Sequence, residues 1–171
     1  MTSGEFTHYA TVHIDHTQLD IQVTSKNGKL LGRPWLTLMI DEHSRNILAF
    51  NLTFDPPSAD SRLTLLRECA HRHGRLPDCI IVDGGREFRS VEFERLTAHN
   101  GVCIVRRPPA KARFGSLIER MFGTINSQLI YRLAGNTQVT KRLRAVTQAN
   151  DPKGQAVWTL SKLHDVLGHC Y

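Results

Sequence analysis

The sequence predicts a mixed α/β domain in which helices cover a five-stranded sheet. Three strand-like segments follow one another between residues 11 and 54, and helical and strand-like segments alternate from residue 58 onward. This order predicts three antiparallel strands followed by two parallel ones. A chain of 171 residues is long enough for one domain with a real hydrophobic core, and too short for two ordinary domains.

The first predicted strand, residues 11–23, changes phase along its length. Its apolar residues occupy even positions up to Ile14 and odd positions from Leu19 onward. Because side chains of a strand alternate between its faces, such a shift turns the apolar set to the other face. We therefore expect a bulge or a break near residues 16–18.

The next two strands complete the antiparallel set. Asn27-Gly28 predicts a hairpin turn. Strands are then predicted at residues 35–40 and 47–54, and Pro56-Pro57 ends this part of the sheet.

The second half of the chain alternates helices with strands. Residues 79–82 form an uninterrupted apolar run that is closed by Asp83 and two glycines, as expected of a strand buried on both faces. The predicted elements, in order, are a helix from Ser58 to Gly74, the strand 79–82, a helix at 91–99, a strand at 102–105, a long helix from about 114–116 to 133, and a short helix at 159–167.

The composition favours an intracellular protein with a polyanionic partner. The net charge is +6, with 22 basic against 16 acidic residues, and most of the basic residues are arginines, whose planar guanidinium suits phosphate. Charge favours nucleic acid without identifying it. We expect neither a membrane span nor a secretory signal, and four cysteines make no secreted disulfide framework. Four potential zinc ligands lie close together in the sequence, but their spacing matches no familiar zinc motif. They are Cys69, His71, His73 and Cys79.

Three acidic residues lie where the structure alone would not require them. Asp15 interrupts a strand rich in Val and Ile, and Asp83 closes the buried strand at the end where open α/β sheets bind ligands. Glu119 opens the long helix, 35 residues beyond Asp83. Each acid alone would more often be a turn, a cap or a helix-dipole residue. All three in this order and spacing are poorly explained as structural residues alone, and three carboxylates that converged would need cations between them.

Other charged residues surround these acids. We interpret Asp20 and Asp41 as structural, and Glu87 as a group that supports the metal ligands. A basic run is usually a solvated face, but the one here leads directly into the helix of Glu119, and we therefore predict contacts with DNA phosphates. The predicted contact residues are Arg106, Arg107, Lys111, Arg113 and Arg120.

Taken together, the motifs resemble those of a known family. They are HIDHT at 13–17, GRPWLT at 32–37, DEHSR at 41–45, FDPPS at 54–58, IVDGGREF at 81–88, RPP at 107–109 and RFGSLIER at 113–120. Over residues 11–135 the chain resembles the catalytic core of DNA transposases of the retroviral-integrase superfamily, above all Mu-like and Tn-seven-type B-subunit bacterial transposases. One departure is Gly84, where the family usually has Asn.

The resemblance implies a ribonuclease-H-like fold and a division of the chain. Residues 1–10 would be a tail or a remnant of cloning, residues 11–135 the catalytic core, and residues 136–171 a C-terminal extension with a short helix. It also implies that the chain is a core without the flanking domains of full-length enzymes, so that in isolation it should be weakly active and largely monomeric.

The resemblance further implies a mechanism. Asp15, Asp83 and Glu119 would bind two Mg²⁺ ions, with Mn²⁺ able to substitute and Asp15 bridging both. Water would free a 3′-hydroxyl at the element end, and that hydroxyl would attack target DNA. Implied partners are transposon-end and target DNA, further copies of the chain in a synaptic complex and other transposition proteins, in the bacterial cytoplasm near the nucleoid. Two alternatives stay open: a nuclease of the same fold, and a noncatalytic DNA-binding or assembly module.

Overall fold

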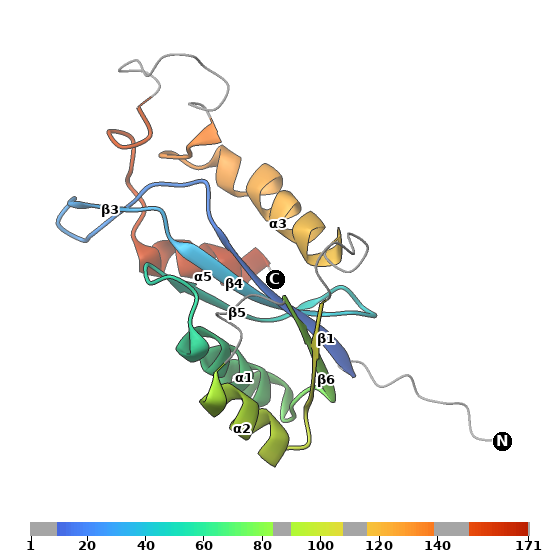
Figure 1. Ribbon diagram of the computed structural model, residues 1–171. Helices are drawn as coiled ribbons and strands as arrows, with labels where there is room; N and C mark the ends of the chain where they lie inside the picture. Colours follow the sequence, from blue (N-terminus) through green and yellow to red (C-terminus); the bar gives the residue numbers. More distant parts are fainter. Residues whose placement is uncertain (1–9, 84–89, 108–115, 139–150, 171) are drawn as a thin grey trace. The chain divides into compact units, whose positions relative to one another are not determined.

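The computed structural model describes residues 10–83, 90–107, 116–138 and 151–170 (Figure 1). Five strands form one sheet in the order β5-β4-β1-β6-β7, and two more form a separate pair, β2-β3. The strands are β1 (Thr11–Gln18), β2 (Val23–Thr24), β3 (Leu30–Gly32), β4 (Trp35–Asp41), β5 (Ile47–Thr53), β6 (Cys79–Val82) and β7 (Cys103–Arg106); the helices are α1 (Ala59–His73), α2 (Val91–His99), α3 (Ser116–Gln128) and α5 (Leu160–Cys170). Within these ranges no helix is long and apolar enough to cross a membrane.

The five-stranded sheet is mixed, as the sequence predicts. β1 pairs in parallel with β6, and β6 pairs in parallel with β7. The neighbours β4 and β5 are joined by the short turn at residues 42–46, which only an antiparallel pair allows. The predicted bounds of β6 and α2 are confirmed to the residue, and those of β4, β5, β7 and α5 to within three.

Contacts divide the chain into two compact units. The first contains residues 1–15, 37–51 and 57–118, and the second contains residues 16–36, 52–56 and 119–171. Both units draw on segments far apart in the sequence, so neither is a continuous stretch of chain.

The core of the first unit lies between the sheet and the helices α1 and α2 (Figure 1). Alternate residues of β1 and β6 point into it because a strand shows every second side chain to each face. Its fully buried members include Val12, Ile14, Ile80, Val82 and Phe93. Burial of these side chains fixes the register of β1 against β6, and with it the level of the residues that follow them.

Helix α1 begins and ends where predicted, but its buried face differs. Ser58 occupies the N-cap position without a side-chain cap bond, and Gly74 ends the helix with φ +69°. The helical spacing of Leu63, Leu66 and Ala70 predicts a buried stripe, but only Leu66 of the three is fully buried, together with Leu65 and Cys69, and Leu63 packs against this core as a partly buried residue. The helix packs on α2 as well as on the sheet, and this widens and rotates the covered face. Cys69 lies in this core as a free cysteine, where its side chain acts as a small hydrophobic residue.

In the second unit, the predicted break of the first strand is confirmed. β1 ends at Gln18, and Val23–Thr24 forms a strand of the separate hairpin. Between them Leu19 donates its backbone N–H to the carbonyl of Pro34, 2.9 Å away. The apolar residues on both sides of the break are buried. Ile14 before the break and Leu19 after it are each fully covered.

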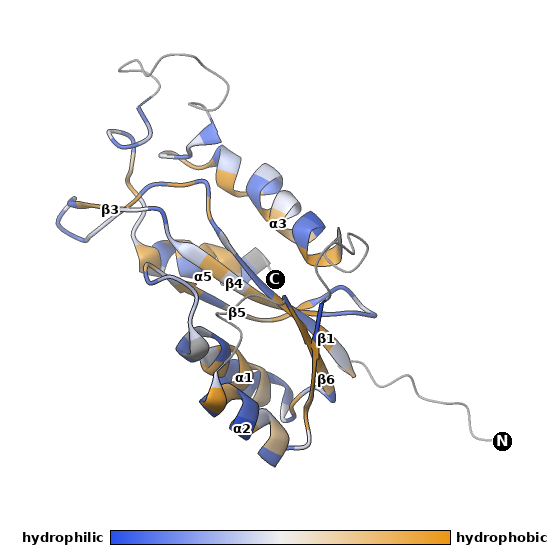
Figure 2. Cartoon of the chain, in the orientation of Figure 1, coloured by the Kyte–Doolittle hydropathy of each residue, from blue (hydrophilic) through white to orange (hydrophobic). Residues whose placement is uncertain are grey.

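The long helix is shorter than predicted. α3 ends at Gln128, and a 3₁₀ turn, Ile130–Arg132, follows it. A 3₁₀ turn has three residues per turn rather than 3.6, so the buried position moves from Leu129, where continued α-helical spacing from Ile125 would put it, to Ile130, which is fully covered. Figure 2 shows hydrophobic and hydrophilic residues alternating along α3, as in an amphipathic helix.

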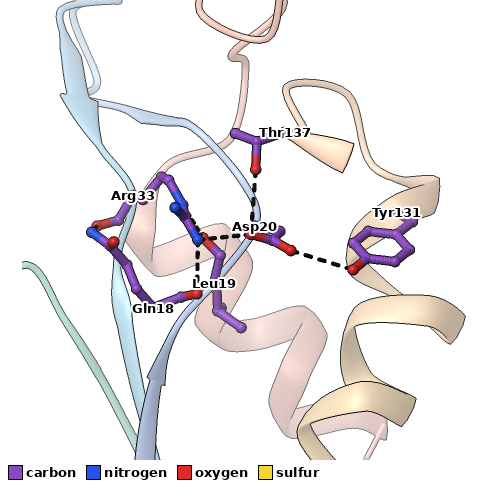
Figure 3. A network of polar contacts seen from close by, with 6 residues as sticks. All are labelled: Gln18, Leu19, Asp20, Arg33, Tyr131 and Thr137. Atoms are coloured by element: carbon purple, nitrogen blue, oxygen red, sulfur yellow. Dashed lines mark hydrogen bonds and ion pairs between the residues drawn. The ribbon is translucent and has the colours of Figure 1, made fainter. Parts of the chain in front are cut away.

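Asp20 joins distant parts of the second unit (Figure 3). Its carboxylate accepts hydrogen bonds from Arg33 Nη2 at 2.7 Å, Tyr131 Oη at 3.3 Å and Thr137 Oγ1 at 3.4 Å. Its backbone carbonyl also accepts from the N–H of Thr137 at 2.8 Å. The structure agrees with the interpretation of Asp20 as structural. The same holds for Asp41, whose Oδ2 accepts from the N–H of Ser44 in the turn after β4.

Candidate active site

Three adjacent parallel strands bring charged residues to one edge of the first unit. Ile14 of β1 is registered with Val82 of β6, and Val82 with Arg106 of β7. The next residues of the three segments are Asp15, Asp83 and Arg107. Two of the three predicted acids are therefore brought side by side, at the carboxyl end of the strands, where sheets of this kind bind ligands.

Asp15 is held by an ion pair. Arg107 Nη2 lies 2.9 Å from Asp15 Oδ2, and the two side chains are 9% and 19% exposed. The main chain of Arg107 is fixed as well, because its N–H donates to the carbonyl of Val82 at 2.9 Å. Val82 is the residue just before Asp83. The backbone of Arg107 is therefore anchored beside Asp83, and its side chain is bonded to Asp15.

Asp83 follows β6 and is exposed. Its exposure and the partial exposure of Asp15 leave this edge accessible to solvent. The predicted supporting residue Glu87 and the family departure at Gly84 lie outside the described residues, as do the predicted DNA contacts Lys111 and Arg113.

Glu119 lies in the first turn of α3 and is exposed, with exposed Arg120 beside it. Both belong to the second unit, whereas Asp15 and Asp83 belong to the first. The convergence of all three acids therefore stays a prediction, and so does phosphate contact by Arg120.

Arg106 is engaged on the surface of the first unit. Its guanidinium forms an ion pair with Glu94 of α2, and both side chains are more than 40% exposed. Exposed pairs of this kind contribute little to stability and exchange readily with other partners. The predicted role of Arg106 in DNA contact stays a prediction.

His13 lies two residues before Asp15 and is buried on the same face of β1. Burial lowers its pKa, although the nearby carboxylate of Glu42, whose Oε1 lies 3.6 Å from Nε2, acts in the opposite direction. The imidazole is therefore neutral at pH 7. It adds no charge to the edge that carries Asp15.

The donors at this edge suit a hard divalent cation. Carboxylate oxygens are what Mg²⁺ prefers, and the guanidinium on Asp15 Oδ2 stands where a cation would be expected. Two aspartates alone are an incomplete set: among the described residues, no three His, Cys, Asp or Glu side chains come together in an arrangement that could hold a metal. Sequence reasoning found both aspartates, but it assigned Arg107 to DNA and missed its bond to Asp15, for which no local pattern exists.

Comparison with known proteins identifies relatives among transposases. The family described as the TnsB C-terminal domain matches residues 13–76 and 71–135. The transposase for transposon Tn552 of Staphylococcus aureus is 30% identical over 128 residues, which are 71% of this chain and 26% of that protein. The Tn7 transposition protein TnsB of Escherichia coli is 26% identical over 135 residues, 67% of this chain and 19% of that protein. The chain thus spans about a quarter or less of these relatives.

Solved structures show the same fold. A chain of the simian T-cell lymphotropic virus intasome, solved in complex with a PP2A regulatory subunit, matches with a TM-score of 0.59 at 17% identity, covering 84% of this chain and 45% of that one. The trimeric form of the HTLV-2 integrase catalytic core domain in complex with magnesium matches with a TM-score of 0.54 at 17% identity, covering 92% and 88%. At this identity the likeness establishes the ribonuclease-H-like fold and nothing more.

Proposed function

The chain belongs to the TnsB C-terminal domain family of integrase-superfamily transposases, and we propose that it is the part that cuts and joins DNA. In this proposal the chain hydrolyses a phosphodiester at the element end, and the freed 3′-hydroxyl then attacks a phosphodiester of target DNA, which joins the element end to the target and releases the 3′-oxygen of the target strand. Asp15, Asp83 and Glu119 are the catalytic residues. The three-acid assignment comes from the sequence, and Glu119 enters it by its spacing from Asp83.

One observation carries the proposal: Asp15 and Asp83 follow a registered pair of buried residues on adjacent parallel strands. Nothing in the packing of β1 and β6 requires two acids there, because the core contacts come from the residues just before them. Two anionic groups side by side repel one another unless a cation compensates them. Their placement is therefore better explained by ligand binding than by stability.

Mg²⁺ is the cation that this donor set suits best, and Mn²⁺ is expected to substitute. Asp15, Asp83 and Glu119 would hold two ions. When bound, the ions would supply activation of the attacking oxygen and stabilisation of the leaving one. The residues of this chain would fix the ligand positions, through the register of β1 with β6, and would place arginines near the phosphate.

DNA, both the transposon ends and the target, is the proposed substrate. The net charge of +6 and the predominance of arginine among the basic residues support it. We propose phosphate contacts by Arg106, Arg107, Lys111, Arg113 and Arg120, with Glu87 supporting the metal ligands. Assembly of further copies and of other transposition proteins in the bacterial cytoplasm, near the nucleoid, is part of the same proposal.

The test is a nicking and joining assay on DNA that carries element ends, with Mg²⁺ or Mn²⁺. Asp83→Asn should abolish both reactions while leaving the circular dichroism spectrum unchanged. Asp78→Asn is the matched control, because Asp78 is an exposed aspartate at the opposite end of β6 and should leave both reactions unchanged. A folded and fully active Asp83→Asn protein would contradict the assignment.

The same assay separates the two alternatives. A nuclease of this fold would nick without joining, in the presence of a free 3′-hydroxyl end and target DNA. A noncatalytic DNA-binding or assembly module would bind DNA and do neither, and its binding would be indifferent to the charge of Asp83.

A further inference from the structure

Arg107 reaches across the candidate active site. It follows Arg106, which is registered with Val82, and it bonds Asp15 on the far side of β6. Neighbouring strands are about 4.8 Å apart, so β7 and β1 are separated by about 10 Å. The side chain must therefore extend past the end of β6, where Asp83 follows, before its guanidinium meets Asp15.

This arrangement sets one positive charge against the two negative charges of the aspartates, so a net negative charge remains for a cation. The Arg107 side chain is only 9% exposed and its N–H is anchored to the Val82 carbonyl, so it is held in place rather than moving freely in solvent. An arginine that bonds a carboxylate keeps that carboxylate oriented and lowers the repulsion from a neighbouring one. The side chain of Arg106, one residue earlier, is not bonded to Asp15, because it pairs with Glu94 on the surface.

We propose that Arg107 is a positioning residue that holds Asp15 before divalent ions bind, and that the ions displace it. This inference rests on the proposed function, because it takes Asp15 as a metal ligand. A divalent ion bound to Asp15 would repel the guanidinium that lies 2.9 Å from Oδ2, and it would neutralise the negative charge that holds the guanidinium there. Ion binding therefore competes with the Asp15–Arg107 pair.

Displacement has a consequence for DNA. A guanidinium released from Asp15 remains anchored beside Asp83 through its backbone, so it lies next to the place where a phosphate must bind for the proposed chemistry. Metal binding should then strengthen DNA binding through Arg107, and by thermodynamic reciprocity DNA should strengthen metal binding by the same factor. Arg107 would thus keep Asp15 oriented before the ions bind, and it would contact a DNA phosphate after the ions displace it.

The first experiment measures Mn²⁺ affinity of the 171-residue chain without DNA, by calorimetry and by the electron paramagnetic resonance signal of free Mn²⁺. Arg107→Gln should bind Mn²⁺ about tenfold more tightly than the unchanged chain, equivalent to about 1.4 kcal/mol. Arg107→Lys should lie between the two, because a lysine is a point charge without the planar fork. Arg106→Gln is the matched control and should leave Mn²⁺ affinity unchanged, although it removes the same charge one residue away.

A double-mutant cycle tests whether the effect runs through Asp15. In an Asp15→Asn background, Arg107→Gln should no longer change Mn²⁺ affinity, because the pair that competes with the ion is absent. Arg107→Gln binding Mn²⁺ no more tightly than the unchanged chain would overturn the inference. So would a gain of the same size for Arg106→Gln, or a gain that persists in Asp15→Asn, since either would reveal a general charge effect.

The second experiment measures DNA affinity with and without Mg²⁺ at fixed ionic strength. Mg²⁺ should tighten DNA binding by the unchanged chain severalfold more than by Arg107→Gln, and equal tightening would overturn the coupling. Thermal unfolding with a chelator shows whether each variant is folded, and Arg107→Lys keeps both tests possible if Arg107→Gln is not. Failure of the proposed function would be seen separately from failure of this inference. It would appear as nicking and joining that survive Asp83→Asn, whatever Arg107→Gln does to Mn²⁺ or DNA affinity.

Discussion

Two aspartates five residues apart, Asp15 and Asp20, lie in contrasting surroundings. The Asp20 carboxylate accepts hydrogen bonds from a guanidinium, a phenol and a hydroxyl, and its residue is 6% exposed. The Asp15 carboxylate is bonded by Arg107 and its side chain is 19% exposed, at the solvent edge of the sheet. Asp20 connects three segments of the second unit, whereas Asp15 comes directly after a core residue of the first.

The difference shows how a fold separates a structural acid from one that is available for chemistry. A carboxylate whose acceptor positions are filled by neutral and charged donors from several segments stabilises the fold and has little capacity for a ligand. A carboxylate at a strand end, bonded by an arginine that can be exchanged, keeps its orientation and can take a cation. Substitution of Asp15 should therefore reduce activity more than stability, and substitution of Asp20 should reduce stability more than activity.

The largest expected effect is on activity. Asp15→Asn should reduce divalent-dependent nicking and joining by at least about a thousandfold, because an amide is a weak ligand for a hard cation. The free energy of unfolding should fall less than in Asp20→Asn, because the Asp20 carboxylate also accepts from Tyr131 and Thr137 and so connects distant segments. A variant that loses stability in proportion to activity would remove the contrast with Asp20.

Asp20→Asn should give the reverse result. Loss of the charge leaves Arg33 facing a neutral group, and breaking a largely buried pair typically costs about 3 kcal/mol of unfolding free energy. Urea denaturation measures this loss, and the folded fraction should keep its divalent-dependent activity. Asp165→Asn is the control in the same unit: Asp165 is 66% exposed, and its loss should leave the free energy of unfolding unchanged.

The chain that surrounds Asp20 should be sensitive to added volume. Gly135 has φ +80°, and a Cβ there would meet Ala156 Cα at 3.0 Å and the Gln22 carbonyl oxygen at 3.2 Å. Gly135→Ala should lower the free energy of unfolding by about 2 kcal/mol, through both strain and overpacking. Gly28→Ala, at φ +76° with open space, should lose about 1 kcal/mol. Equal losses of unfolding free energy in the two variants would mean that the second unit does not pack closely around Gly135.

The sequence predicted most of the fold because its signals are local. The run Cys79–Val82, closed by Asp83 and two glycines, marks β6 to the residue, and the shift of apolar parity after Ile14 locates the end of β1 to within a few residues. Order and spacing of Asp15, Asp83 and Glu119 predicted the candidate site, and register brings the first two together.

What could not be predicted depends on contacts between distant residues. The carboxylate of Asp20 finds Tyr131 and Thr137 more than 100 residues away, and Arg107 finds Asp15 at a separation of 92. No window of sequence contains both partners of such a bond. The end of α3 was also missed, because its apolar spacing continues to Leu133 while packing selects Ile130 and tightens the last turn.

The smallest effect dissects the Asp20 cluster itself. Tyr131→Phe removes one hydroxyl that donates to Asp20 Oδ2 at 3.3 Å, and it should lower the free energy of unfolding by about 1 kcal/mol. The ring stays, so packing is unchanged and the loss reports the hydrogen bond. In an Asp20→Asn background the same change should cost less, because a neutral acceptor gives a weaker bond than a charged one. An undiminished loss in that background would mean that the Tyr131 hydroxyl stabilises the fold independently of the charge on Asp20, and Asp20 would then be distinguished from Asp15 mainly by Arg33 and Thr137.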